Sequence, residues 1–175
     1  MSPSQLKQLI HEISFKLGFT QVGISAATYD YHKSEQLHQW LKKGYHASMK
    51  WVENREKERS DINTYFPEAK SVISVSMNYF TGNAHQNNTG KISNYAWGDD
   101  YHDLIKPRLY QLLNEIRSID PNIDGIACID TSPIMEKDWA QKAGLGWIGK
   151  HTNLITQDYG SWVFLGEILL NIELE

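Results

Sequence analysis

The chain has only one cysteine, Cys128, among its 175 residues. One thiol cannot form an intramolecular disulfide, and it cannot by itself hold a cysteine-type zinc site or an iron–sulfur cluster. Long apolar runs are lacking too, because no stretch approaches the roughly 18 residues of a membrane span. The first residues are typical of an amphipathic helix and not of a signal peptide. We therefore expect a soluble, cytoplasmic protein with no membrane partner.

Positive charge is not in excess, since 17 lysines and arginines stand against 21 acidic residues and give a formal charge of −4. No general basic field favours nucleic acid as a partner of this domain alone, although a local basic patch is compatible with these counts. Aromatic residues are plentiful, with six tryptophans and nine tyrosines, and they suit both a core and the pocket of a flat ligand. The length and the 41% hydrophobic content predict a single domain over residues 1–175.

Helical and strand patterns alternate along the chain. Apolar residues at helical spacing predict helices over residues 3–17, 34–43, 103–119 and 134–143. Thr131 and Ser132 are expected to cap the last of these, with Pro133 in its first turn. Short apolar runs predict strands over residues 20–26, 71–79, 125–130, 153–156 and 161–174. The last two are expected to form a hairpin, and the whole pattern predicts an α+β fold with a mixed or antiparallel sheet and flanking helices.

Asp130 is the first candidate for chemistry, because it follows an apolar strand and stands directly before the expected helix cap. A partly desolvated carboxyl group at this place can hold a proton near neutral pH and deliver it to a substrate. The alternative is that Asp130 only binds the backbone N–H groups of the helix beginning at Ser132. The spacing alone favours this capping role.

The glycine-rich residues 144–149 are the second candidate. Three glycines within six residues let the backbone approach a ligand closely, and Lys150, Thr152 and Asn153 then supply donors for amides or phosphate. The spacing differs from the dinucleotide-binding fingerprint. A plain helix end would need only Gly144, so the remaining glycines favour a binding role.

Three further segments allow both a functional and a structural interpretation. The long connection over residues 80–98 and the aromatic segment 93–102 that overlaps its end are typical of binding loops. Within the aromatic segment, His102 could be an acid–base group or a metal ligand, whereas Asp99 and Asp100 are more simply explained as helix caps. Arg55 and Arg59 are typical of a solvated charged face, but an arginine here could also bind a carboxamide or phosphate.

In their order, these segments resemble the N-terminal domain of epoxyqueuosine reductases, the cobalamin-dependent enzymes of tRNA queuosine synthesis. The likeness spans nearly the whole chain, through Arg59 and residues 67–73 (PEAKSVI), 92–102, 130–133 (DTSP), 139–150 (ending AGLGWIGK), 159–161 and 164–167 (FLGE). The chain departs from the family pattern at Asn94 and Asp99, where arginine is common, and at His151, where asparagine is usual.

The resemblance implies a fold similar to nitroreductase-like flavoproteins and cobalamin-processing proteins, with cobalamin as the cofactor of this domain. It also implies a ferredoxin-like domain with 4Fe–4S clusters beyond the end of this chain, so that the chain alone would not complete turnover. The implied reaction is reductive deoxygenation of epoxyqueuosine to queuosine in tRNA, with an external electron donor and Asp130 as proton donor. The implied cofactor contacts are Arg59, Ser93, Asp130, Lys150, Asn153, Leu154 and Ile155.

Two alternatives remain compatible with the sequence. A flavin-dependent nitroreductase would have a similar fold and would also bind a flat ligand that bears phosphate. A cobalamin carrier without catalytic activity would need the cofactor contacts but not the proton donor.

Overall fold

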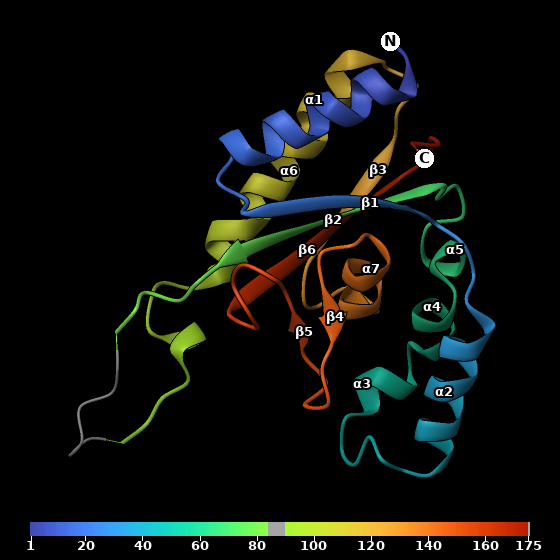
Figure 1. Cartoon of the computed structure of the whole chain (residues 1–175). Coiled ribbons are helices and arrows are strands. Elements are labelled where there is room, and N and C mark those ends of the chain that lie inside the picture. The colour runs from blue at the N-terminus through green and yellow to red at the C-terminus, as the bar shows by residue number, and fades with distance from the viewer. Residues whose placement is uncertain (84–89, 175) are drawn as a thin grey trace.

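The computed structural model describes residues 1–83 and 90–174 (Figure 1). Its helices are α1 (Pro3–Lys16), α2 (Tyr31–Lys42), α3 (Lys50–Glu53), α4 (Glu56–Ser60), α5 (Ile62–Tyr65), the 3₁₀ turn η1 (Asn94–Ala96), α6 (Tyr101–Ile119) and α7 (Glu136–Lys142). Its strands are β1 (Gln21–Ala26), β2 (Ser71–Asn78), β3 (Gly125–Cys128), β4 (Trp147–Ile148), β5 (Leu154–Ile155) and β6 (Val163–Leu170). The predicted α+β class is confirmed.

The main sheet has the strand order β1-β2-β6-β3, and every neighbouring pair is antiparallel. Strand β2 is an interior strand, as its sequence predicts, and its first seven residues are all buried. Alternate residues of β2 face opposite sides of the sheet, so Ile73 and Val75 enter one core whereas Val72 enters another.

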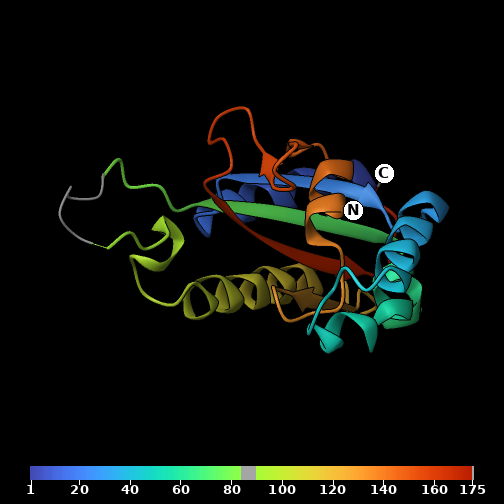
Figure 2. The ribbon, with the colours of Figure 1, turned by 90° about the horizontal axis from the view of Figure 1, so that it is seen from below.

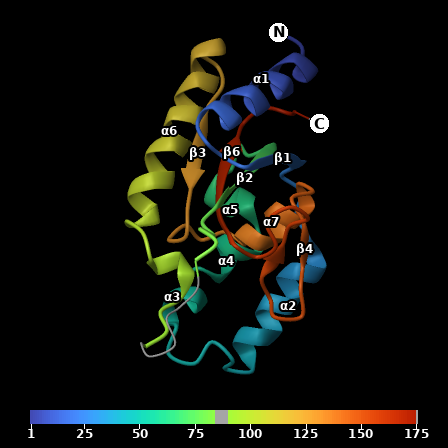
Figure 3. The ribbon, with the colours of Figure 1, turned by 60° about the vertical axis from the view of Figure 1, so that its left-hand side comes forward.

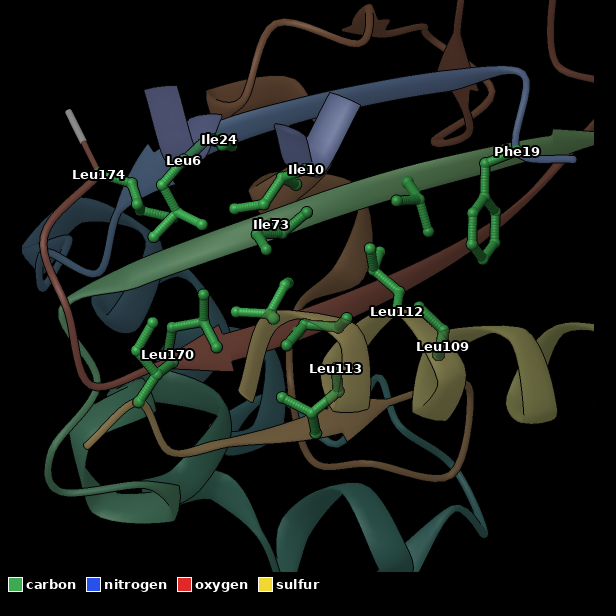
Figure 4. Packing of buried hydrophobic residues seen from close by; sticks show 14 of the residues in the cluster. Leu6, Ile10, Phe19, Ile24, Ile73, Leu109, Leu112, Leu113, Leu170 and Leu174 are labelled. Carbon is green, nitrogen blue, oxygen red and sulfur yellow. The ribbon is translucent and has the colours of Figure 1, made fainter. Parts of the chain in front are cut away.

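Helices α1 and α6 cover one face of this sheet and lie side by side (Figures 1 and 3). Figure 4 shows Leu6 and Ile10 of α1 and Leu109, Leu112 and Leu113 of α6 packed over the strands. Full burial of one such side chain contributes about 1.5–3 kcal/mol, so this face supplies much of the driving force for folding.

The opposite face carries α7 and the small sheet of β4 and β5, and Figure 2 shows α6 and α7 on opposite sides of the main sheet. A second core on this face joins Ile62 of α5 to Val72, Cys128, Ile134 and Leu169. Helices α2 to α5 form a group at one end of the sheet, seen at the right of Figure 1.

The predicted hairpin between the last two strands is wrong. Strand β5 pairs with β4 in a separate two-stranded sheet, whereas β6 lies between β2 and β3 in the main sheet. A bridge between Thr156 and Gly160 closes a tight turn there, and Gly160 has a positive φ of 57°. Strand β6 has apolar side chains on both faces, so an interior position buries more of its surface than a hairpin would.

Two predicted helix starts also differ from the structure. Helix α7 begins at Glu136 and not at residue 134, because the Ser132 hydroxyl accepts a hydrogen bond from the Ile129 N–H (3.4 Å) and is directed back to the strand. Helix α2 begins three residues earlier than predicted, since Asp30 accepts from the Lys33 N–H (3.1 Å) and caps it.

Residues 79–83, which follow β2, extend away from the sheet (Figure 1). Residues 84–89 of the expected binding loop lie outside the described residues, and residues 94–96 near its end form η1. In the described ranges, no helix combines the length and the apolar character that crossing a membrane requires.

Candidate functional site

Asp130 lies where the chain leaves the β3 edge of the sheet, and its backbone is in an unusual conformation. Its φ of 39° falls in the left-handed region, which few residues other than glycine enter, aspartate and asparagine being among those few. The Asp130 N–H donates to Glu136 Oε1 at 2.5 Å. Residues in such conformations cost on the order of 1–3 kcal/mol each and persist only where surrounding contacts hold them, which occurs most often at functional sites.

The Asp130 side chain is more exposed than its sequence neighbours predict. It is 55% accessible to solvent, so the expected desolvation by the strand is not found. The capping role is not found either, because α7 begins six residues later and its N-terminus has no side-chain cap. The carboxylate instead approaches His102 Nε2 at 3.3 Å, and its charge acts on the nearby Tyr101 hydroxyl.

The first turn of α6 supplies these two partners. Asp100 caps the helix by accepting from the His102 N–H (2.9 Å), which confirms the predicted capping, and it also contacts His102 Nδ1 at 2.8 Å. The bond to Asp100, and then that to Asp130, raises the pKa of His102. Burial, and then the charge of Asp130, raises the pKa of Tyr101 to about 12, so its hydroxyl stays protonated and can donate.

Tyr101 is held in place by stacking on Phe164 of β6, with ring centroids 4.4 Å apart and planes at 11°. Stacking of this kind contributes about 0.5–1.5 kcal/mol beyond burial of the ring surface. The hydroxyl that faces Asp130 is therefore fixed from the main sheet.

Glu136 and Arg59 are two further charged residues near Asp130, and they interact electrostatically with it and with each other. Burial raises the pKa of Glu136 to about 7, the bond from the Asp130 N–H opposes this rise, and the Asp130 charge adds to it. Arg59 is partly buried, its Nη1 donates to the Ile134 carbonyl (3.2 Å), and burial lowers its pKa.

Two adjoining hollows open beside these groups, with volumes of about 490 and 350 Å³. Both are lined by Tyr79, Tyr95, Lys137, Asn153, Val163 and Leu165. Tyr101, Asp130, Glu136 and Phe164 complete the larger one, and Ser93, Leu154 and Ser161 complete the smaller. Four predicted site residues, Ser93, Asp130, Asn153 and Leu154, therefore surround one continuous region although they lie up to 61 positions apart in the sequence.

The other predicted contacts lie outside this lining. Arg59 borders a separate cavity of about 310 Å³ between α2, α4 and α7. Lys150 is exposed in the turn after β4, and Ile155 pairs with Trp147 in the small sheet.

The glycine-rich segment approaches its own sheet very closely. A Cβ atom at Gly146 would lie 2.1 Å from the Ile155 carbonyl oxygen, so this glycine is required for the β4–β5 pair itself. A Cβ at Gly149 would instead meet the ends of the His151 and Ile155 side chains at 2.7 Å. Gly144 ends α7 with a positive φ of 82°, as its position after the helix predicts.

Sequence reasoning assigned no role to Tyr101, Glu136 or Lys137. Lys137 Nζ donates to the Thr152 carbonyl (2.7 Å) and thereby connects α7 to the turn that bears Asn153. Glu136 is typical of an acidic residue in the first turn of a helix, so no local signal distinguishes it. Among residues 1–83 and 90–174, no group of three or more histidines, cysteines, aspartates or glutamates is arranged to hold a metal ion, and His102 binds carboxylates instead.

Comparison with known proteins points to one family. A family model described as "Epoxyqueuosine reductase QueG, DUF1730" matches residues 59–131, which include Arg59, the first turn of α6 and Asp130. An epoxyqueuosine reductase of Streptococcus thermophilus has the same fold, with a TM-score of 0.83 and 26% identity over 97% of this chain and 46% of its own. Fold and site thus define a reductase-type α+β domain with an acidic loop beside an open hollow.

The particular family follows from the sequence relatives. An epoxyqueuosine reductase of Cellulophaga algicola is 40% identical over 95% of this chain and 54% of its own length. The chain belongs to the epoxyqueuosine reductase family, and it spans about half the length of the curated relatives it matches. A further structure with the same fold (TM-score 0.85, 23% identity, 99% of this chain and 47% of that one) is an epoxyqueuosine reductase with an epoxyqueuosine-modified tRNA-Tyr stem loop.

Proposed function

We propose that this chain is the cobalamin-binding and proton-donating part of an epoxyqueuosine reductase, which converts epoxyqueuosine to queuosine in tRNA. The observation that carries the proposal is the Asp130 loop, whose strained backbone presents an exposed carboxyl group at the rim of the larger hollow. Residues in such conformations cluster at functional sites, which supports a role for Asp130 beyond folding.

The lining of the two hollows fits cobalamin chemically. The corrin ring is flat and bears amide side chains, and the lining offers Tyr79, Ser93, Tyr95 and Asn153 as aromatic surfaces and hydrogen-bonding groups. The Lys137 ammonium adds a strong donor on the same side. When bound, the cofactor would supply the low-potential redox chemistry, and the chain would supply position and a proton.

Asp130 performs the proton transfer in this proposal. Removing the oxygen of an epoxide to leave an alkene consumes two electrons and two protons and releases water. The electrons come from an external donor, and the oxygen leaves as water only if an acid protonates it as negative charge develops there. His102 contacts the Asp130 carboxyl group and orients it, and the Tyr101 hydroxyl lies nearby.

The substrate assignment rests on the family. A relative with the same fold holds an epoxyqueuosine-modified tRNA stem loop. This chain carries a net charge of −4, so we propose that the complete protein, and not this half alone, provides most of the phosphate contacts.

The decisive test is Asp130→Asn in the complete enzyme. Asparagine keeps the shape and also tolerates the left-handed conformation, but it has no proton to transfer. We expect single-turnover deoxygenation to fall by roughly 10²-fold or more, whereas cobalamin binding and the thermal midpoint stay nearly unchanged.

Asp103→Asn is the matched control, because it removes an exposed carboxylate one residue beyond His102. This variant should turn over at the wild-type rate. An Asp130→Asn enzyme that is destabilised but fully active would return Asp130 to a structural role.

A further inference from the structure

Glu167 is a charged residue at the centre of the main sheet. It is completely buried in β6, and its two carboxyl oxygens have no hydrogen-bond partner among the described residues. It lies directly opposite Ser74 of β2 and Cys128 of β3, so these three side chains share one face of the sheet. This is the face that α7 covers. A carboxyl group buried without partners favours its neutral form, because water no longer stabilises the charge.

Glu136 interacts both with this buried carboxyl group and with the candidate proton donor. It is partly buried at the first residue of α7, its Oε1 accepts the Asp130 N–H at 2.5 Å, and its charge acts on Glu167. The two glutamates therefore connect the interior of the sheet to the Asp130 loop.

The groups that surround Glu136 set its charge. Arg59 of α4 and Lys137 of α7 favour the ionised form, whereas Asp130 disfavours it. Cys128 of β3 and Tyr101 of α6 also face this charge, but burial raises the pKa of each to about 12, so both stay neutral. A negative charge on Glu136 is thus stabilised by two cations and a backbone N–H. A second negative charge, on Glu167, would have no such stabilising partner.

We propose that Glu136 and Glu167 form a carboxyl pair that carries one negative charge, with the proton on Glu167, and that the ionised Glu136 positions Asp130. In this arrangement Glu136 is a positioning residue, since it touches the Asp130 backbone and not the reacting atoms. Its charge strengthens the hydrogen bond that keeps Asp130 in the left-handed conformation. The functional consequence rests on the proposed role of Asp130, but the geometry of the pair does not.

The position of the Asp130 loop should therefore depend on pH. Burial raises the pKa of Glu136 to about 7 and raises that of Glu167 well above its usual range. When Glu136 is protonated, its bond to the Asp130 N–H loses its charge assistance. We expect the loop to be held less firmly below about pH 7 than above it.

Amide NMR of the full 175-residue chain tests this directly. The ¹H and ¹⁵N shifts of the Asp130 amide should titrate with a midpoint near the Glu136 pKa of about 7. Glu136→Gln should abolish this titration, and Glu167→Gln should leave its midpoint within roughly half a pH unit, because the glutamine mimics a neutral Glu167.

Asp138→Asn is the matched control, since this acidic residue lies in the same helical turn but pairs with Lys33. It should leave the Asp130 titration intact. If Glu136→Gln does not fold, Glu136→Asp replaces it and should keep the titration while moving the Asp130 amide proton upfield at high pH.

The inference is overturned by an Asp130 amide that does not shift between about pH 5.5 and 8.5, or by persistence of the titration in Glu136→Gln. A midpoint lowered by more than about one unit in Glu167→Gln would equally overturn it, by showing that Glu167 carries a charge.

A second measurement separates this inference from the proposed function. In the complete enzyme, saturated with cofactor, Glu136→Gln should flatten the dependence of the single-turnover rate on pH around 7. If the amide titrates as expected but the rate profile does not change, the pair positions Asp130 and Asp130 is not the proton donor. If the amide does not titrate, the pair has no such role whatever the rate shows.

Discussion

At the scale of the residue, Asp130 shows how a fold can present a reactive group without burying it. Its carboxyl group is exposed, but its backbone is bound by Glu136 and its side chain by His102. These contacts come from α7 and α6, two elements on opposite faces of the sheet. In this chain alone, the surrounding residues therefore orient the Asp130 carboxyl group but do not shield it from water.

Gly146 gives a sharp test at the same scale. A methyl group at this position would lie 2.1 Å from the Ile155 carbonyl oxygen, which belongs to backbone and cannot move cheaply. We expect Gly146→Ala to lower the free energy of unfolding by roughly 1–3 kcal/mol, the usual range for overpacking. Urea denaturation measures this change, and Gly98→Ala, with nothing within 4 Å of the new methyl, should change it by much less. Equal effects of the two would contradict the close approach seen here.

At the scale of the element, α7 organises the site through three consecutive residues. Glu136 binds the Asp130 N–H, Lys137 binds the Thr152 carbonyl, and Asp138 pairs with Lys33 at 2.8 Å. Successive residues of a helix point about 100° apart, so one short turn can contact three different segments. The start of α7 at Glu136 sets which residue faces which segment.

Lys137→Met tests this organising role. The substitution keeps an apolar stem but removes the donor to the Thr152 carbonyl, so the turn that carries Asn153 should open more often. We expect faster amide hydrogen exchange in residues 151–153 and weaker cobalamin binding, with little change in global stability. Lys33→Met removes a different lysine contact of α7, the pair with Asp138, and serves as control. Exchange that accelerates equally in both variants would argue against a specific link.

At the scale of the whole molecule, the two faces of the main sheet differ in the polarity of the side chains that they bury. The face under α1 and α6 is packed mainly with apolar side chains, whereas the face under α7 also buries the carboxyl group of Glu167. A buried carboxyl group makes stability depend on pH when its proton affinity changes on folding.

The pH dependence of stability should therefore differ from that of an ordinary domain. The pKa of Glu136 rises from 4.5 to about 7 on folding, so between these values the folded chain binds more protons than the unfolded one. Its contribution is fully present below about pH 4.5 and is lost as pH rises to 7, and a shift of this size corresponds to about 3 kcal/mol. Urea denaturation across this range should show wild-type stability falling relative to Glu136→Gln. Parallel curves would contradict the assignment.

Local patterns in the sequence determined most of the secondary structure. Helices α1 and α6 and strands β1 and β2 follow from apolar spacing and end signals, because these depend on residues only a few positions apart. The capping role of Asp100 is local in the same way. The interleaved helix and strand patterns also predicted the α+β class and drew attention to Asp130. The family resemblance added its proton-donor role and the cofactor contacts, which remain predictions.

Only the tertiary structure decided which strands pair and what surrounds Asp130. Strand β6 lies between β2 and β3 because both of its faces are then buried. This depends on segments far apart in the sequence, so a local pattern cannot predict it. Glu136 and Glu167 are 31 positions apart in the sequence. Glu136 is typical of the first turn of a helix, and Glu167 is an isolated charged residue in an apolar strand. Their relation exists because α7 packs across the sheet, and the altered proton affinities follow from the burial that this packing imposes.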